Sequence, residues 1–208
     1  MIKDTFYNLE ESKKQRIIEA LYDEFSEYSY DKASITRICE RAQIPKGSFY
    51  QYFDEKKDAF FVLIDHAAKI KLEYLEKAMD QMDELGFFGT YKEMTVQTIK
   101  MLKKYPRMYK VGKNMLGAHE VMKEILQRYG HMSMDIFNRL IDVGYERNEL
   151  NKNLDRNFLL MYIVNLQNTA GDYMHAYMQG KEIKSPDDYL PFFEQFFEII
   201  ENGVSSNE

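Results

Sequence analysis

Turn-forming residues are scarce in this sequence: four prolines and ten glycines interrupt 208 residues. Sheet proteins need frequent turns, so a chain this poor in turn residues favours long helices. No stretch alternates as a strand does, and apolar residues instead recur every three or four positions. The hydrophobic fraction of 45% supplies enough apolar material for a core. We therefore expect an all-α fold.

Several classes of protein are excluded by what the sequence lacks. The longest apolar run covers residues 158–164, far short of the roughly 20 residues of a membrane-spanning helix. The N-terminus carries no apolar signal segment. One cysteine rules out an internal disulfide. We expect a cytoplasmic protein that makes no contact with a membrane.

Catalytic and metal-binding motifs are also missing. The four histidines lack the spacing of metal ligands, and the sequence has no phosphate loop or nucleophile elbow. Cys39 lies on an apolar stripe, which favours a place in the core over reactivity. We expect no enzymatic activity, no metal and no cofactor.

About nine helices follow from the apolar periodicity and the cap residues. Asn8, with Glu11 three residues later, predicts the start of the first. Gly86 and Gly89 predict a loop, Gly117–His119 a break, and Ser185-Pro186 a strong helix start. The expected segments are residues 8–30, 34–42, 45–52, 54–85, 90–104, 106–147 (with that break), 155–179 and 186–204, followed by a frayed tail from Ser205.

Residues 34–53 predict two short helices joined by a tight turn. Ile35, Ile38, Cys39 and Ala42 form a single apolar face, and Pro45 ends that pattern and begins the next. This is the construction of a helix-turn-helix, in which one helix braces and the second enters the major groove of DNA.

The second short helix has an inner and an outer face. Phe49 and Phe53 fall at i and i+4 and can pack inward. The remaining positions are expected to face outward, where hydroxyl and ammonium groups suit phosphates and base edges. They are Lys46, Gly47, Ser48, Tyr50, Gln51 and Tyr52.

Charge supports this interpretation locally but not globally. The chain carries a net charge of −6, which argues against a nucleic-acid binder. Residues 32–57, however, hold six basic and three acidic side chains. Lys56 and Lys57 oppose the dipole of the next helix, and a bound phosphate would remove that penalty. A compact helical corner with a solvated lysine surface is the alternative.

The amino-acid sequence of this segment is more specific than that of a generic pair of short helices. Ala33-Ser-Ile-Thr-Arg-Ile-Cys and Gln43-Ile-Pro-Lys-Gly-Ser-Phe-Tyr-Gln-Tyr-Phe-Asp-Glu-Lys closely resemble the TetR family of bacterial transcriptional regulators. The resemblance covers about residues 9–65 in detail and the remainder in architecture only. It divides the chain into a DNA-binding domain, residues 1–57, and an effector-binding and dimerisation domain, residues 58–208.

The resemblance implies how DNA would be held. Matched by motif position, the contacts would come from Thr36, Lys46, Gly47, Ser48, Tyr50, Tyr52 and Lys56. Gln43 departs from the family, which often has glycine at this turn. A side chain in left-handed conformation costs about 1 kcal/mol, so the turn is expected to differ slightly.

The last two helices carry more apolar surface than a monomer needs, although a thick internal core is the alternative. Members of this family dimerise through them, and two-fold symmetry would match a palindromic operator in double-stranded DNA. The expected interface residues are Leu159, Ile163, Leu166, Phe192, Phe193, Phe196, Phe197 and Ile200.

The family also implies a small-molecule effector, here apolar or aromatic. Candidate pocket residues combine aromatics, methionines and polar groups, although ordinary core packing is the alternative for each. They are Tyr105, Met108, Tyr109, Met115, Phe137, Phe158, Tyr162, Asn165 and Thr169.

The sequence thus predicts a homodimeric repressor that an effector releases from its operator. A ligand-independent DNA-binding or partner-recruiting factor of the same fold is the main alternative. An all-helical enzyme or binding module with an incidental helix pair is the other.

Overall fold

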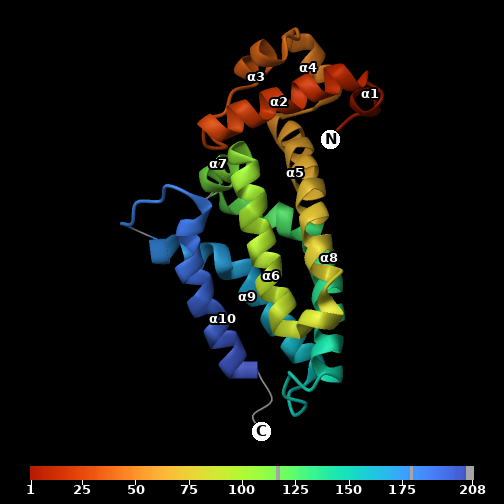
Figure 1. The fold of residues 1–208 in the computed structure, drawn as a ribbon. Helices are drawn as coiled ribbons and strands as arrows, with labels where there is room; N and C mark the ends of the chain where they lie inside the picture. Colours follow the sequence, from red (N-terminus) through yellow and green to blue (C-terminus); the bar gives the residue numbers. More distant parts are fainter. Residues whose placement is uncertain (116–117, 179, 205–208) are drawn as a thin grey trace. The chain divides into compact units, whose positions relative to one another are not determined.

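The computed structural model describes residues 1–115, 118–178 and 180–204, and nearly all of them are helical. The elements are α1 (Asp4–Tyr7), α2 (Glu11–Glu27), α3 (Ile35–Ala42), α4 (Lys46–Tyr52), α5 (Lys56–Met79), α6 (Met82–Lys104), α7 (Pro106–Asn114), α8 (His119–Glu146), α9 (Arg156–Met178), the 3-10 helix η1 (Pro186–Tyr189) and α10 (Leu190–Val204) (Figure 1). The prediction of an all-α fold is confirmed. Within these ranges, no helix has both the length and the hydropathy needed to cross a bilayer.

The first compact unit comprises residues 1–72 and 104–115. It contains α1 to α4, most of α5, and α7. Its core is aromatic: Phe25 and Phe60 are buried, and their ring centroids lie 4.7 Å apart. Phe49 and Phe53, also buried, pack at 5.0 Å. Aromatic pairs at these distances add stability beyond the area they bury. They stabilise the core on which the short helices α3 and α4 pack.

Helix α7 belongs to this first unit although it is distant in sequence. Arg107 donates from Nη1 to Asp23 of α2 at 2.7 Å and from Nη2 to Glu19. Asn114 Nδ2 donates to the last carbonyls of α2, including that of Ser26 at 2.9 Å. These carbonyls lack partners inside their own helix, so α7 completes the C-terminal end of α2.

The second unit comprises residues 73–103 and 116–208, within which α6, α8, α9 and α10 form a helical bundle (Figure 1). Tyr91 of α6 links α8 and α10, because its ring lies 5.1 Å from that of Phe137 and 5.0 Å from that of Phe197. The fully buried side chains of this core include Phe87, Leu140, Ile141, Leu150 and Ile163.

The loop expected at Gly86 and Gly89 is not formed. The helix continues through Gly89, and only Gly86 leaves helical geometry, with φ 67° and ψ −167°. The Phe87 amide that this kink frees donates to Glu149 Oε2 at 2.7 Å, and Arg147 holds the other oxygen of that carboxylate at 2.8 Å. A distant carboxylate therefore caps the second part of α6, which local sequence does not reveal.

Two helix starts were predicted from cap residues, at Ser185 and at Asn8, and the structure agrees with one of them. The Ser185 prediction is confirmed: its side chain accepts from the Asp187 amide, and Asp188 completes the capping box. The Asn8 prediction is wrong, because Asn8 ends the short helix α1 and α2 begins after Glu10 without a side-chain cap.

The boundaries differ in two further respects. The helix expected to reach residue 85 ends at Met79, and α6 begins at Met82. The two compact units also do not separate at residue 57, since the first includes most of α5 and all of α7. The break expected at Gly117–His119 falls where α7 has ended, at Asn114, and α8 begins, at His119. Residues 116–117 and the tail from Ser205 lie outside the described residues.

Candidate nucleic-acid interface

Helices α3 and α4 are joined by a turn centred on Gln43. Gln43 adopts the left-handed conformation, with φ 54° and ψ 47°. The Gln43 amide donates to Glu40 O at 3.2 Å, and the Ile44 amide donates to Cys39 O at 3.0 Å. This pattern satisfies the last carbonyls of α3. The turn therefore has the geometry for which glycine is usual, built here with glutamine.

Replacing Gln43 with glycine is expected to raise the free energy of unfolding by up to about 1 kcal/mol, because glycine adopts positive φ without strain. Gln127→Gly in α8 is the matched control and should lower that free energy by about 1 kcal/mol, since it places glycine inside a helix. Urea denaturation followed by circular dichroism measures both. A loss of stability in the Gln43 variant would contradict the strain argument.

The inner face of the helix pair is formed by buried apolar side chains. Phe49 and Phe53 anchor α4 as expected, and Cys39 is buried on α3, where desolvation raises the pKa of its thiol. Tyr52 differs from the prediction: it is only 5% exposed, with Lys13 Nζ 5.5 Å from its ring centroid. Tyr52 is three residues after Phe49 and therefore lies on the same, inward face of α4. Its side chain is not accessible to a DNA phosphate in this structure.

The outer face presents the other predicted contacts together. Thr36 on α3 and Lys46, Gly47 and Tyr50 on α4 are exposed, and Ser48 is half-buried. A Cβ at Gly47 would meet no atom within 4 Å, so the fold itself leaves the surface open there. This short polar face, with one aromatic side chain and one ammonium group, can donate hydrogen bonds to phosphates and base edges.

Lys56 has a role that the sequence did not predict. Its Nζ donates to the carbonyls of Tyr30 at 2.6 Å, Asp31 at 3.3 Å and Ala33 at 3.1 Å, and lies 4.7 Å from the centroid of the Tyr30 ring. An ammonium group has three protons to donate, and all three have acceptors here. Lys56 thus fixes the α2–α3 loop through three carbonyls that the helix-dipole prediction did not include.

The local positive charge is smaller than the sequence count. Arg37 donates from Nη2 to the fully buried Glu24 at 2.5 Å, a bond that raises the pKa of the guanidinium. Arg41 donates to Glu27 at 2.6 Å. Both acids precede residue 32 and were outside the counted window. The two arginines therefore join α3 to α2, and Lys46 supplies the ammonium group on the outer face of α4.

The N-terminal arm is a part of the site that sequence reasoning missed. Ile2 pairs with Phe53 in a β-bridge, and the Lys3 amide donates to Tyr52 O at 2.9 Å. Lys3 Nζ donates to Tyr50 O at 2.7 Å. Phe6 is buried against Phe53 at 5.1 Å. The arm thus satisfies the C-terminal carbonyls of α4, and the apolar side chains of Ile2 and Phe6 in the N-terminal segment were the available signal.

The nine predicted effector residues are divided between the two compact units. Tyr105, Met108, Tyr109 and Met115 lie in the first unit, at or beside α7, whereas Phe137 is buried in the core of the second. The four residues on α9 are all exposed: Phe158 (66%), Tyr162 (41%), Asn165 and Thr169. The groove between α6 and α10, lined by residues such as Lys92, Phe193 and Glu201, includes none of the nine.

Most of the predicted dimer residues are buried within the chain instead of exposed on its surface. Leu159 and Ile163 on α9 and Phe192, Phe197 and Ile200 on α10 are buried within the chain itself, while Leu166, Phe193 and Phe196 are partly buried. The exposed apolar side chains are instead Phe158, Met161, Tyr162 and Tyr173 on α9 and Ile199 on α10. The inward and outward faces of α9 were therefore interchanged.

Comparison with known proteins agrees with this geometry. Residues 17–63 match the family model described as bacterial regulatory proteins, tetR family. An uncharacterized HTH-type transcriptional regulator of Lactococcus lactis is 35% identical over 78 residues, a match that spans 38% of this chain and 39% of that relative.

Two solved structures extend the likeness over all or most of the chain. A TetR family transcriptional regulator from Chloroflexus aurantiacus is 27% identical, with complete coverage of both chains and a TM-score of 0.60. The fatty acid degradation regulator FadR from Bacillus halodurans shares the fold, at 18% identity, a TM-score of 0.63, and coverage of 91% of this chain and 96% of that one. Residues 17–63 thus carry the N-terminal domain of the bacterial regulatory proteins of the tetR family, and the whole chain is similar in fold to a TetR family transcriptional regulator.

Proposed function

We propose that the chain is a transcriptional repressor that binds a palindromic operator in the cytoplasm. The observation that carries this proposal is the outer face of α3 and α4, where Thr36, Lys46, Gly47 and Tyr50 are exposed together on a buried aromatic base. A helix braced in this way can enter the major groove with its first residues against base edges.

Homodimerisation would place two such helices on one operator. The support is the stripe of exposed apolar side chains on α9: Phe158, Met161 and Tyr162 recur at i, i+3 and i+4, and Tyr173 continues the same face. Exposed apolar side chains grouped on one face of a helix mark an interaction site. A second copy of the chain would cover it and relate the recognition helices by two-fold symmetry.

We further propose that a small molecule bound by the second unit releases the repressor. The effector would favour a conformation in which the two recognition helices no longer match successive major grooves. The B. halodurans neighbour, described as a fatty acid degradation regulator, is too distant in sequence to transfer its effector to this chain.

Operator binding tests the proposal directly. Fluorescence anisotropy with duplexes from the promoter region of the protein's own gene should show salt-dependent, saturable binding. Tyr50→Ala is expected to weaken that binding about tenfold, since the side chain is 45% exposed on the outer face. The control Glu146→Gln, an exposed acid on α8, should leave it unchanged. Absence of salt-sensitive binding to every candidate duplex would overturn the proposal.

One observation favours the ligand-independent alternative. Phe137, the effector candidate buried in the core of the second unit, is packed against Tyr91, with the ring centroids 5.1 Å apart. The alternative predicts that no small molecule raises the melting temperature. A thermal-shift screen with aromatic and amphiphilic compounds separates the two, because a ligand that binds the folded state stabilises it.

A further inference from the structure

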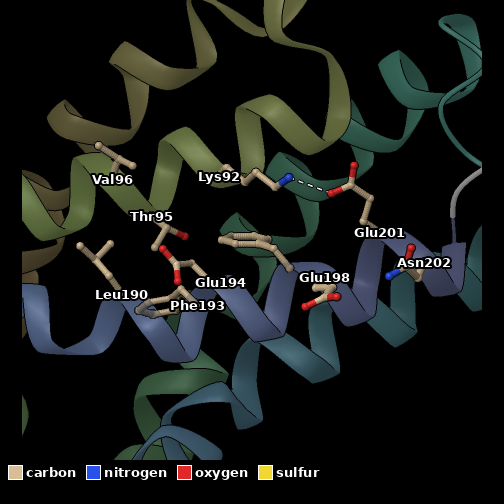
Figure 2. Close-up of a pocket in the computed structure, with 10 residues that line it drawn as sticks. Lys92, Thr95, Val96, Leu190, Phe193, Glu194, Glu198, Glu201 and Asn202 are labelled. Atoms are coloured by element: carbon tan, nitrogen blue, oxygen red, sulfur yellow. Dashed lines mark hydrogen bonds and ion pairs between the residues drawn. The ribbon is translucent and has the colours of Figure 1, made fainter.

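An open groove runs between α6 and α10 in the second unit (Figure 2). Its volume is about 510 Å³, within the range of roughly 300–1,000 Å³ typical of small-molecule sites. The residues that line it are Lys92, Thr95, Val96, Leu190, Phe193, Glu194, Phe197, Glu198, Glu201 and Asn202.

Ion pairs hold the two sides of the groove together. Lys92 Nζ lies 2.7 Å from Glu201 Oε2, the contact drawn in Figure 2. Further along α6, Lys103 Nζ lies 2.6 Å from Asp187 Oδ2 of η1, which leads into α10. The two lysines are separated by about 16 Å of helix at 1.5 Å per residue. From α6, the groove is lined by Lys92 and by the short side chains of Thr95 and Val96.

The floor of the groove is apolar. Phe193 and Phe197 of α10 lie on one side, Val96 of α6 on the other, and Leu190 at one end. Val96 keeps 36% of its surface exposed, and Phe193 is only partly buried. Removing this surface from water would favour a ligand with an aromatic or branched apolar body.

The rim of the groove is acidic. It carries three glutamates and one lysine, and Glu201 is already paired with that lysine. Glu194 and Glu198 are exposed, and neither has an ionic partner among the described residues. Figure 2 shows Glu194 beside Phe193. A ligand that fills the apolar floor therefore meets uncompensated negative charge, which an organic cation complements.

The groove is separate from the surface proposed for dimerisation. Phe193 and Phe197, which line it, occupy one face of α10. Ile199, 69% exposed, lies two residues beyond Phe197 and so projects on the opposite side of the helix. A dimer formed through α9 and the Ile199 side of α10 would leave the groove accessible.

We propose that the α6–α10 groove binds a lipophilic organic cation. The apolar body lies on Phe193, Phe197 and Val96, and the charged centre lies between Glu194 and Glu198. None of the residues expected to contact DNA takes part, so the proposal holds or fails independently of operator binding.

Isothermal titration calorimetry of the full chain with tetraphenylphosphonium tests the site, with triphenylphosphine oxide as the neutral probe of similar shape. Saturable binding of one cation per chain is expected, and at least about tenfold weaker binding of the oxide. The double variant Glu194→Gln/Glu198→Gln should bind the cation about tenfold more weakly, each exposed charge contributing a few-fold. Lys92→Gln removes the only positive charge on the rim and should strengthen binding about two- to threefold.

The control is Glu120→Gln/Glu146→Gln, which removes the same charge from exposed positions on α8 outside the groove. It should bind as the unaltered chain does. Val96→Trp should fill the groove and abolish binding without changing the sedimentation coefficient. No cation binding, equal binding by the oxide, or equal binding by both double variants would overturn the proposal. Dissociation of a dimer by Val96→Trp would overturn it as well, since the occupant would then be a second copy of the chain.

Discussion

Replacing Gly86 with alanine is expected to lower the free energy of unfolding by about 3 kcal/mol or more. At φ 67° and ψ −167°, Gly86 occupies a backbone region that is essentially restricted to glycine. A Cβ there would also overlap the carboxylate of Glu149. Displacing that carboxylate would leave the Phe87 amide at the kink without its acceptor. Backbone strain and a lost charge-assisted hydrogen bond therefore add together.

The matched control is Gly130→Ala in α8 of the same unit. Gly130 is helical, and a Cβ there would meet no atom within 4 Å. Alanine should raise the free energy of unfolding by up to about 1 kcal/mol, because it is the better helix former. Urea denaturation followed by circular dichroism gives both values. Two variants of equal stability would show that the capped kink at Gly86 does not constrain the fold.

Features that depend on local chemistry were predictable from the sequence. The capping box at Ser185 and the inward anchors Phe49 and Phe53 follow from residues within a few positions of one another. The same local information identified Lys46 and Tyr50 on an outer face, where the structure places them.

Features that depend on distant partners were not predictable. The loop expected at Gly86 is instead a kink capped by Glu149, 63 positions away. The face of α9 was assigned wrongly because apolar residues surround much of this helix, and periodicity then gives no direction: Leu159 is buried while its neighbour Phe158 is exposed. Tyr52 was placed outward for a related reason, since tyrosine suits a wet surface and a half-polar core equally.

Replacing Lys56 with methionine is expected to lower the free energy of unfolding by about 2 kcal/mol, because charged hydrogen bonds to the α2–α3 loop are lost. Lys56 is the group that bonds the carbonyls of Tyr30, Asp31 and Ala33. The loop leads directly into α3, so its loosening would also weaken operator binding. Lys46→Met should leave stability within about 0.5 kcal/mol of the unaltered chain, since Lys46 is exposed at the start of α4.

Salt dependence distinguishes this positioning role from a phosphate contact. Each phosphate that a lysine neutralises adds about one unit to the slope of log K against log salt concentration. Lys46→Met should therefore reduce that slope by about one, whereas Lys56→Met should weaken binding and keep the slope, because its ammonium group is already used within the fold. Both slopes are measured by anisotropy titrations at salt concentrations from about 50 to about 200 mM. Protein–DNA affinity falls steeply over this range. A reduced slope with unchanged stability for Lys56→Met would return this lysine to the DNA-contacting set, and would mean that the ammonium group leaves the loop carbonyls when the operator is bound.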